Sequence, residues 1–374
     1  MTAAAAIRSP SSLRPMRTVP GRVRRLPMLA RRLVLAACAA SAGIAHAADP
    51  APLPALGADL RQVSVSGLSS GAFMAAQFDV AWSSRLIGAG IIAGGAFHCA
   101  GESALVDPAT AAMTLCMRPL GEAPSAAHAW RDAQRFAKAR EIDDPAGLRK
   151  QRIYLFSGAK DTVVATRVVD QAARFYQLAG VPERNLRYRR DPDAGHALIT
   201  GNPGDAACDA NRSPYINHCG FDLAQDILRW IYAKPGAPLN PPAGQAGGQL
   251  LAFDQRAFDP ARQASLAATG YAYVPADCDR AACAVHVAFH GCAQSVASIG
   301  QRFVRDGGYN ALADTNRIVV LYPQVEKSSV NPLGCWDFWG YSSPDPDHPN
   351  FSTREAPQMR AVMAMIRRLG EARP

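Results

Sequence analysis

Apolar residues along the chain form two patterns that alternate with one another. Apolar or alternating runs predict strands, and the continuous runs are typical of a parallel sheet that is covered on both faces. These runs lie at 63–66, 87–95, 153–157, 186–189, 284–289 and 318–322. Helical spacing of apolar residues predicts helices at 71–83, 126–141, 165–178, 221–233, 303–315 and 354–369. Strands that alternate with helices predict an α/β fold with a mostly parallel, doubly wound sheet.

Two segments interrupt this alternation. Residues 96–125 predict no regular element and contain Cys99 and Cys116. Residues 235–248 hold four prolines and four glycines. Such a composition predicts a linker or an exposed loop.

The segment 1–47 differs in composition from the rest of the chain. It contains eight arginines and no acidic residue, and its apolar run at 33–40 is followed by Ala45-His46-Ala47. A basic region, a short apolar run and an Ala-x-Ala site predict a signal peptide cleaved after Ala47, which leaves one catalytic domain at 48–374. The run is too short for a transmembrane helix, and a disordered basic arm would leave it unexplained.

Removing this segment changes the charge of the protein. The whole sequence carries a formal net charge of +9, and 9 − 8 leaves +1 for residues 48–374. A nearly neutral surface gives no reason to expect nucleic acid or an anionic membrane as a partner. We expect a secreted protein, extracellular or periplasmic, without membrane insertion.

Cysteine usage agrees with export. Nine cysteines are present, and eight remain when Cys38 of the leader is removed. An even number in an exported chain predicts disulfides, although eight cysteines allow 105 pairings. Our interpretation pairs them in sequence order, as Cys99–Cys116, Cys208–Cys219, Cys278–Cys283 and Cys292–Cys335.

A nucleophile motif follows the first predicted strand. Gly67-Leu68-Ser69-Ser70-Gly71 has the form G-x-S-x-G and stands between a strand pattern and a helix pattern. In α/β-hydrolases this context presents the serine above the sheet, and the next backbone N–H faces the developing oxyanion. We therefore predict Ser69 as the nucleophile and Ser70 as an oxyanion donor, with a simple connecting turn as the alternative.

An acid and a base follow in the order that this mechanism requires. Asp161 and His196 each come directly after a predicted strand. In α/β-hydrolases the acid and the base follow the serine in that order, beyond the carboxyl ends of strands. His196 is the predicted general base, and Asp161 the carboxylate that orients it. Asp161 could instead cap a helix, and Asp170 and Asp193 are alternative acids.

The other histidines fit the role of base less well. His128 lies in a predicted helix and His286 in the middle of a strand, which favours structural roles. His286 and His290 are four residues apart, but on a strand without an intervening glutamate they do not form a zinc motif. We expect no metal and no cofactor.

The second oxyanion donor is expected in an unusual place. Residues 289–292, Phe-His-Gly-Cys, have the character of an oxyanion loop but come after the triad. In the usual order, this strand and loop precede the nucleophile strand. The sequence therefore predicts a circularly permuted α/β-hydrolase fold in which 235–248 joins the old ends, a change that nearby termini permit. A separate C-terminal domain is the alternative.

Three segments together resemble a known family. Gly67–Phe73, His290–Cys292 and Gly334–Tyr341 are similar to the esterase/poly(3-hydroxybutyrate) depolymerase family, in particular its circularly permuted single-domain type. The resemblance covers essentially all of residues 48–374. It implies the triad given above, oxyanion N–H groups at Ser70 and Cys292, and a substrate-groove tryptophan that Trp336 or Trp339 could match.

The expected function is that of a secreted serine esterase. The resemblance implies hydrolysis of poly(3-hydroxybutyrate) or its oligomers through an acyl-enzyme on Ser69. An aromatic loop around Trp336 and Trp339 could contact an aliphatic ester chain, or could simply pack in the core. A feruloyl or acetyl-xylan type carbohydrate esterase is the alternative activity, and a non-catalytic polymer-binding protein the alternative class.

Overall fold

The computed structural model describes residues 50–374 except residues 104 and 235. The predicted signal peptide at 1–47 lies outside the described residues. Within the described part, the helices fall short of the length and apolar character that a membrane span requires.

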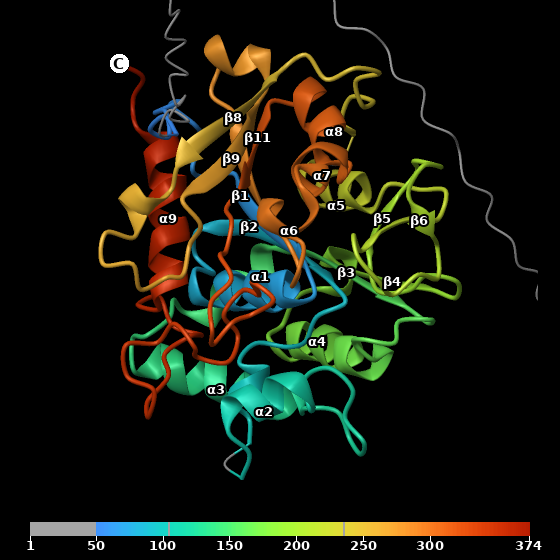
Figure 1. Cartoon of the computed structure of the whole chain (residues 1–374), viewed down its shortest axis with the longest axis vertical. Coiled ribbons are helices and arrows are strands. Elements are labelled where there is room, and N and C mark those ends of the chain that lie inside the picture. The colour runs from blue at the N-terminus through green and yellow to red at the C-terminus, as the bar shows by residue number, and fades with distance from the viewer. Residues whose placement is uncertain (1–49, 104, 235) are drawn as a thin grey trace, which may run out of the picture. The chain divides into compact units, whose positions relative to one another are not determined.

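An eight-stranded sheet forms the centre of the molecule (Figure 1). The spatial order is β4-β3-β2-β1-β10-β11-β9-β8. Within this sheet, β9 runs in the direction opposite to that of all the other strands. The strands are β1 Val63–Leu68, β2 Leu86–Ile92, β3 Arg152–Gly158, β4 Leu186–Asp191, β8 Gln249–Asp254, β9 Thr269–Val274, β10 Ala284–Phe289 and β11 Ile318–Tyr322. The mostly parallel sheet confirms the predicted fold class.

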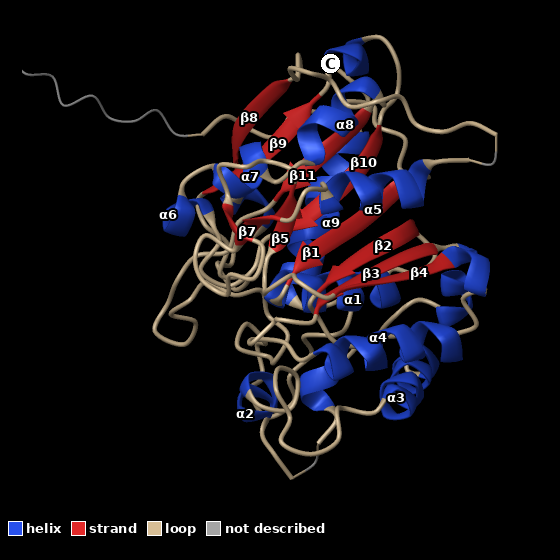
Figure 2. Cartoon of the chain, turned by 90° about the vertical axis from the view of Figure 1, so that its right-hand side faces the viewer, coloured by secondary structure: helices blue, strands red, loops and turns tan. Residues whose placement is uncertain are grey.

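Helices cover both faces of this sheet. Figure 2 shows α5 and α8 on one side of the strands and α1 and α4 on the other. The helices are α1 Ser70–Ala81, α2 Pro108–Met113, α3 Ala126–Lys138, α4 Thr166–Leu178, α5 Leu223–Tyr232, α6 Val296–Ile299, α7 Arg302–Asp306, α8 Tyr309–Thr315 and α9 Pro357–Gly370. Because both faces are covered, the central strands β1, β10 and β11 are almost entirely buried, as their apolar runs predict.

Both halves of the chain contribute to the same sheet. Residues 63–67 of β1 pair in parallel with 285–289 of β10. The end of α9 also lies beside the approach to β1, where the N–H groups of Leu56 and Ala58 donate to the carbonyl of Leu369 (3.1 and 3.0 Å). This is the arrangement that the permuted order predicts, and a separate C-terminal domain does not fit the β1–β10 pairing.

Two local predictions were wrong, and one small sheet was not predicted. The helix expected at 303–315 is two helices, α7 and α8, because the chain turns at Gly307-Gly308 and Gly308 adopts a left-handed φ of +86°. The segment 96–125 contains the short helix α2, which Asp107 caps by accepting from the Thr110 N–H (3.0 Å). Residues 198–218 also form a small sheet of β5 Leu198–Thr200, β6 Ala206–Ala207 and β7 Ile216–His218.

Four disulfides pair the cysteines in sequence order, as expected. They are Cys99–Cys116, Cys208–Cys219, Cys278–Cys283 and Cys292–Cys335. The last of these joins the loop after β10 to the aromatic loop before α9. Two segments that are separated by β11 in the chain are thereby held together beside the end of β1.

Candidate active site

The turn between β1 and α1 has the geometry of a nucleophile elbow. Ser69 has φ +58° and ψ −122°. Residues other than glycine rarely adopt this backbone conformation, which costs about 1–3 kcal/mol. A Cβ atom on Gly67 would lie 2.2 Å from the Gly71 carbonyl oxygen, and one on Gly71 would lie 2.4 Å from the Phe289 carbonyl oxygen. The motif therefore needs both glycines, since only hydrogen atoms fit where the elbow packs against itself and against the end of β10.

The predicted base and acid meet in a direct hydrogen bond. His196 Nδ1 lies 2.8 Å from Asp161 Oδ2, and the two residues are 3% and 7% exposed. The other carboxylate oxygen, Oδ1, accepts from the backbone N–H groups of Val163 (2.7 Å) and Val164 (2.8 Å). With an ionised carboxylate as its partner, Nδ1 carries the proton, so Nε2 of the neutral ring is free to accept one.

The structure does not favour the alternatives to Asp161 as the acid. Helix α4 begins at Thr166 after the N-cap residue Ala165, so Asp161 does not cap it. Asp170 accepts from Tyr188 and Arg190, and Asp193 pairs with Lys160. Neither Asp170 nor Asp193 is therefore the carboxylate that is bonded to His196.

A cavity of about 150 Å³ is lined by both the predicted nucleophile and the predicted base. Ser69 and His196 line it, together with Gly291 and Cys292 of the loop after β10. Its apolar wall includes Met113, Met117, Val163, Tyr215 and Leu333. Sequence reasoning missed these lining residues, because no local pattern says that α2 and the loop before Cys335 reach the end of β1.

Two backbone N–H groups have no partner among the described hydrogen bonds and can serve an oxyanion. The N–H of Ser70 stands in the first turn of α1, where a helix offers no internal acceptor. The N–H of Cys292 follows Gly291, whose Cβ position lies only 3.5 Å from the Ser69 Cβ. Both predicted donors therefore belong to segments that touch Ser69.

His290 orients the second of these groups. Its Nδ1–H donates to the Gly291 carbonyl (2.8 Å), and its Nε2 accepts from the Val325 N–H (3.2 Å). In a trans peptide the carbonyl and the next N–H point in opposite directions, so the Cys292 N–H is turned away from His290. Burial lowers the pKa of His290 to about 4, which keeps the ring neutral. The sequence analysis placed His290 in this loop but did not find this role.

The two candidate tryptophans do not line the cavity that holds Ser69. Trp336 is completely buried, with its ring 4.8 Å from that of Phe289. Trp339 is half-buried and packs against Tyr341. The aromatic loop turns its rings inward, since Phe338 stacks on the Phe73 ring of α1 at 4.3 Å. Packing against α1 and the end of β10 therefore accounts for the positions of Trp336 and Phe338.

Among the described residues, no cluster of three or more His, Cys, Asp or Glu side chains is arranged to hold a metal ion. A larger cavity, of about 450 Å³, is lined by the starts of β2 and β3 and the end of α5. Its lining includes Arg61, Lys150 and Lys234 but neither serine, cysteine nor histidine. The predicted catalytic residues lie instead beyond the carboxyl ends of the strands.

Comparisons with known proteins give consistent relatives, although no family model matches the chain. The sequence is 41% identical over 336 residues to a poly(3-hydroxybutyrate) depolymerase of Delftia acidovorans, covering 87% of this chain and 63% of that protein. It is 34% identical over 338 residues to a polyhydroxybutyrate depolymerase of Talaromyces funiculosus, covering 85% of this chain and 92% of the relative. The chain thus spans less than two thirds of the first relative and nearly all of the second.

Solved structures agree with this. A PHB depolymerase from Penicillium funiculosum superposes with a TM-score of 0.75 at 33% identity, covering 85% of this chain and 98% of the other. A PHB depolymerase with a serine-to-alanine substitution, complexed with an R3HB trimer, matches with the same TM-score and coverage at 32% identity.

Proposed function

Because this chain belongs to the poly(3-hydroxybutyrate) depolymerase family, we propose that it is a serine esterase that hydrolyses poly(3-hydroxybutyrate) or its oligomers. The observation that carries the proposal is the strained Ser69 elbow, which shares a cavity with the Asp161-bound imidazole of His196. A turn that only connects a strand to a helix does not require such a strained backbone conformation.

Acylation begins with a proton transfer. His196 Nε2 takes the proton of Ser69 Oγ as the oxygen attacks the ester carbonyl carbon, and Asp161 stabilises the imidazolium that forms. The carbonyl oxygen becomes an oxyanion that accepts from the N–H groups of Ser70 and Cys292. The ester C–O bond then breaks, and His196 returns its proton to the leaving oxygen, which becomes the hydroxyl end of the released chain.

Deacylation repeats these steps with water. His196 removes a proton from a water molecule that attacks the acyl carbon, and the same two N–H groups hold the second oxyanion. When the intermediate collapses, Ser69 Oγ leaves and recovers its proton from His196. The product is a 3-hydroxy acid or an oligomer that ends in a carboxyl group. Apart from water and the ester, every group in these steps is a side chain or a backbone N–H of this chain.

The cavity suits an uncharged aliphatic ester. Methionine, valine and leucine side chains make up much of its lining, with Met113 and Leu333 partly exposed at 48% and 53%. A 3-hydroxybutyrate unit is small and apolar apart from its ester group, so it can bury its methyl and methylene groups against such a wall. A relative that binds an R3HB trimer supports the same class of substrate.

Export belongs to the same proposal. Four disulfides are typical of an oxidising compartment, and the sequence of residues 1–47 has the pattern of a cleaved leader. We expect the purified enzyme to begin at Ala48 and to be found in the medium or the periplasm. Sequencing the N-terminus of the purified enzyme checks whether cleavage occurs after Ala47.

The experiment that tests the activity compares two substrates. We expect release of soluble 3-hydroxybutyrate species from amorphous poly(3-hydroxybutyrate), and hydrolysis of p-nitrophenyl butyrate, both lost by at least ~10⁴-fold in Ser69→Ala. Hydrolysis of the small ester without release from the polymer would contradict the substrate but not the mechanism. Activity retained by Ser69→Ala would overturn the mechanism.

A further inference from the structure

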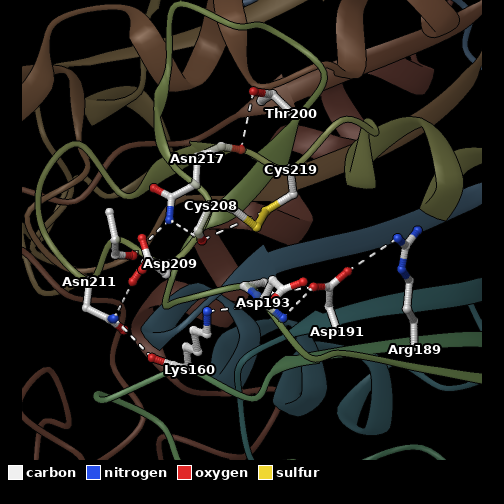
Figure 3. Close-up of a disulfide and its surroundings, with 12 residues drawn as sticks. Lys160, Arg189, Asp191, Asp193, Thr200, Cys208, Asp209, Asn211, Asn217 and Cys219 are labelled. Carbon is white, nitrogen blue, oxygen red and sulfur yellow. Dashed lines mark hydrogen bonds and ion pairs between the residues drawn. A yellow bond between two sulfur atoms is a disulfide. The ribbon is translucent and has the colours of Figure 1, made fainter.

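The loop at 208–219 is built against the base of the site. Its ends are joined by the Cys208–Cys219 disulfide (Figure 3). The Gly195 N–H donates to the Cys208 carbonyl (2.8 Å), and a Cβ on Gly195 would lie 2.4 Å from the Ala210 carbonyl oxygen. The residue just before His196 is therefore pressed against this loop, at a distance that only glycine allows.

Asn211 extends from this loop to both partners of the catalytic dyad. Its Oδ1 accepts from the backbone N–H of Thr162 (2.9 Å) and from that of His196 (2.9 Å). Its Nδ2 donates to the carbonyl of Lys160 (3.0 Å), the contact drawn in Figure 3, and to that of Asp209 (2.8 Å). One amide thus uses both acceptor positions and both donor hydrogens.

These four bonds determine where two backbones stand relative to each other. Lys160 and Thr162 flank Asp161, so the acid is held on both sides by the amide of Asn211. The bond to the His196 N–H fixes the backbone that carries the base. The Asp161–His196 hydrogen bond, 2.8 Å long, spans these two segments. A shift of either backbone would lengthen it or misdirect the imidazole.

The same loop is also joined to the oxyanion segment. Gln294 is completely buried, and its Oε1 accepts from the Gly291 N–H (2.8 Å). Its Nε2 donates to the carbonyls of Pro214 (3.1 Å) and Tyr215 (3.0 Å) of the disulfide-closed loop. The ring of Tyr215 stands edge-on to the His196 ring, with centroids 5.8 Å apart. The loop therefore contacts the acid, base and oxyanion segments.

We propose that Asn211 is a positioning residue of this enzyme, which sets the relative placement of Asp161 and His196 through the disulfide-closed loop. The inference rests on the proposed triad. It predicts a loss of turnover that does not come from loss of folded protein or of substrate binding, because Asn211 does not line the cavity. Misplacement of a catalytic group by about 1 Å can cost ~10²-fold in rate.

The test compares Asn211→Ala with the matched variant Asn316→Ala. Asn316 also joins two segments by amide-to-backbone bonds, to Asn240 and Leu312. It stands just before β11, at the amino ends of the parallel strands, whereas Ser69 stands at their carboxyl ends. Both variants and the wild type are assayed with p-nitrophenyl butyrate, and Tm is measured for each. The fraction of competent enzyme is taken from the endpoint of Ser69 labelling by a fluorophosphonate.

We expect Asn211→Ala to lower kcat per labelled site by roughly 10- to 100-fold with KM within about twofold of the wild type. We expect Asn316→Ala to keep kcat per labelled site while lowering Tm. A wild-type kcat per labelled site in Asn211→Ala, or an equal loss in both variants, overturns the proposal.

Two further variants keep the result decisive. If Asn211→Ala yields too little folded enzyme, Asn211→Asp retains the size and the acceptors while losing the two amide donors to Lys160 and Asp209. The expected result is again a lower kcat at constant KM, and a wild-type kcat overturns the proposal. Ser69→Ala in the same assay separates the two levels: if it stays active, the triad itself is wrong, whatever Asn211→Ala shows.

Discussion

Strand β1 leads into two Ser–His arrangements that use the same residue types for different ends. Ser64 and Ser66, within the strand, bond to His286 of β10. Ser69, just beyond the strand, shares a cavity with His196. Position relative to the end of the strand therefore decides whether such residues support the interior or border a cavity.

The internal arrangement allows one order of hydrogen bonds. Tyr232 donates to a backbone carbonyl (2.9 Å), so it accepts from Ser64 Oγ (2.7 Å), which in turn accepts from His286 Nδ1–H (2.7 Å). On the other side, His286 Nε2 accepts from Ser66 Oγ (2.8 Å), and Ser66 accepts from Tyr309 (2.7 Å). Both ring nitrogens of His286 are thus occupied, and the ring is neutral.

The two histidines differ in what surrounds them. His286 is completely buried, and burial lowers its pKa to about 3, so it stays neutral over the usual range of pH. No carboxylate is bonded to it, whereas His196 is bonded to Asp161. His196 also borders the cavity, with Nε2 not committed to a partner among the described hydrogen bonds. These surroundings are why we propose the second arrangement, rather than the first, as the one that transfers a proton.

Replacing each of the two histidines in turn gives the largest expected difference between the two arrangements. We expect His196→Gln to lower kcat by roughly 10⁴-fold or more, because the general base is lost. We expect His286→Gln to keep kcat per folded molecule within about twofold and to lower the unfolding free energy by ~1–3 kcal/mol. Esterase kinetics and urea unfolding measure both. A large loss of kcat in His286→Gln would show that the internal network takes part in catalysis.

A second pair compares serines of the two arrangements by stability. Ser66→Ala leaves His286 Nε2 and the Tyr309 hydroxyl without a buried partner, so we expect the unfolding free energy to fall by about 1–3 kcal/mol. We expect Ser69→Ala to change it by less than ~0.5 kcal/mol, since no hydrogen bond of its Oγ contributes to the fold among the described residues. Urea unfolding with the disulfides intact gives both values. Equal losses in the two variants would contradict the distinction.

The smallest expected effect is a difference in the pH dependence of stability. The folded-state pKa of His286, about 3, is lower than the ordinary value of about 6.5, so the unfolded chain binds the proton first as pH falls. The contribution of His286 is therefore present above pH ~6.5 and is lost progressively below it. Replacing this residue should flatten the acid side of the stability curve by up to ~1.4 kcal/mol per pH unit.

The effect of His286 on the pH dependence of stability must be measured as a difference between the wild type and a variant, because other buried groups titrate as well. Burial raises the pKa of Asp79 to about 7, so its contribution is present at low pH and is lost as pH rises, opposite in sign to that of His286. His290 titrates in the same direction as His286. Urea unfolding of wild type and His286→Gln between about pH 7 and pH 5 isolates the one group. Parallel curves would contradict a neutral, buried His286.

The local parts of the site could be predicted from the sequence because their causes are local. Gly67 and Gly71 are required by contacts within one turn, and that requirement is visible as G-x-S-x-G. The order of Ser69, Asp161 and His196 along the chain also predicted the Asp161–His196 contact, since the carboxyl ends of parallel strands lie at one edge of the sheet. The roles of these residues and of the oxyanion N–H groups stay proposals until the variants are measured.

Other parts of the site could not be predicted. Nothing near Asn211 in the sequence indicates that its amide bonds to Thr162 and Lys160, 49 and 51 residues earlier in the chain, and to His196, 15 residues earlier. Trp336 is a case that the sequence left open, since an aromatic side chain beside the predicted oxyanion loop has the same sequence pattern whether it faces substrate or the core. It is buried because the loop packs on β10 and α1.

Sequence patterns were enough to predict most strands and helices of the central sheet, the turn at Ser69, and an even set of eight cysteines in residues 48–374. These depend on hydrophobic spacing and backbone freedom, which act over a few neighbouring residues. Only the tertiary structure established which N–H groups stay without a partner among the described residues and which amide joins the segments of Asp161 and His196. Hydrogen bonds between distant segments depend on distances that only the packing of the whole sheet and its helices establishes.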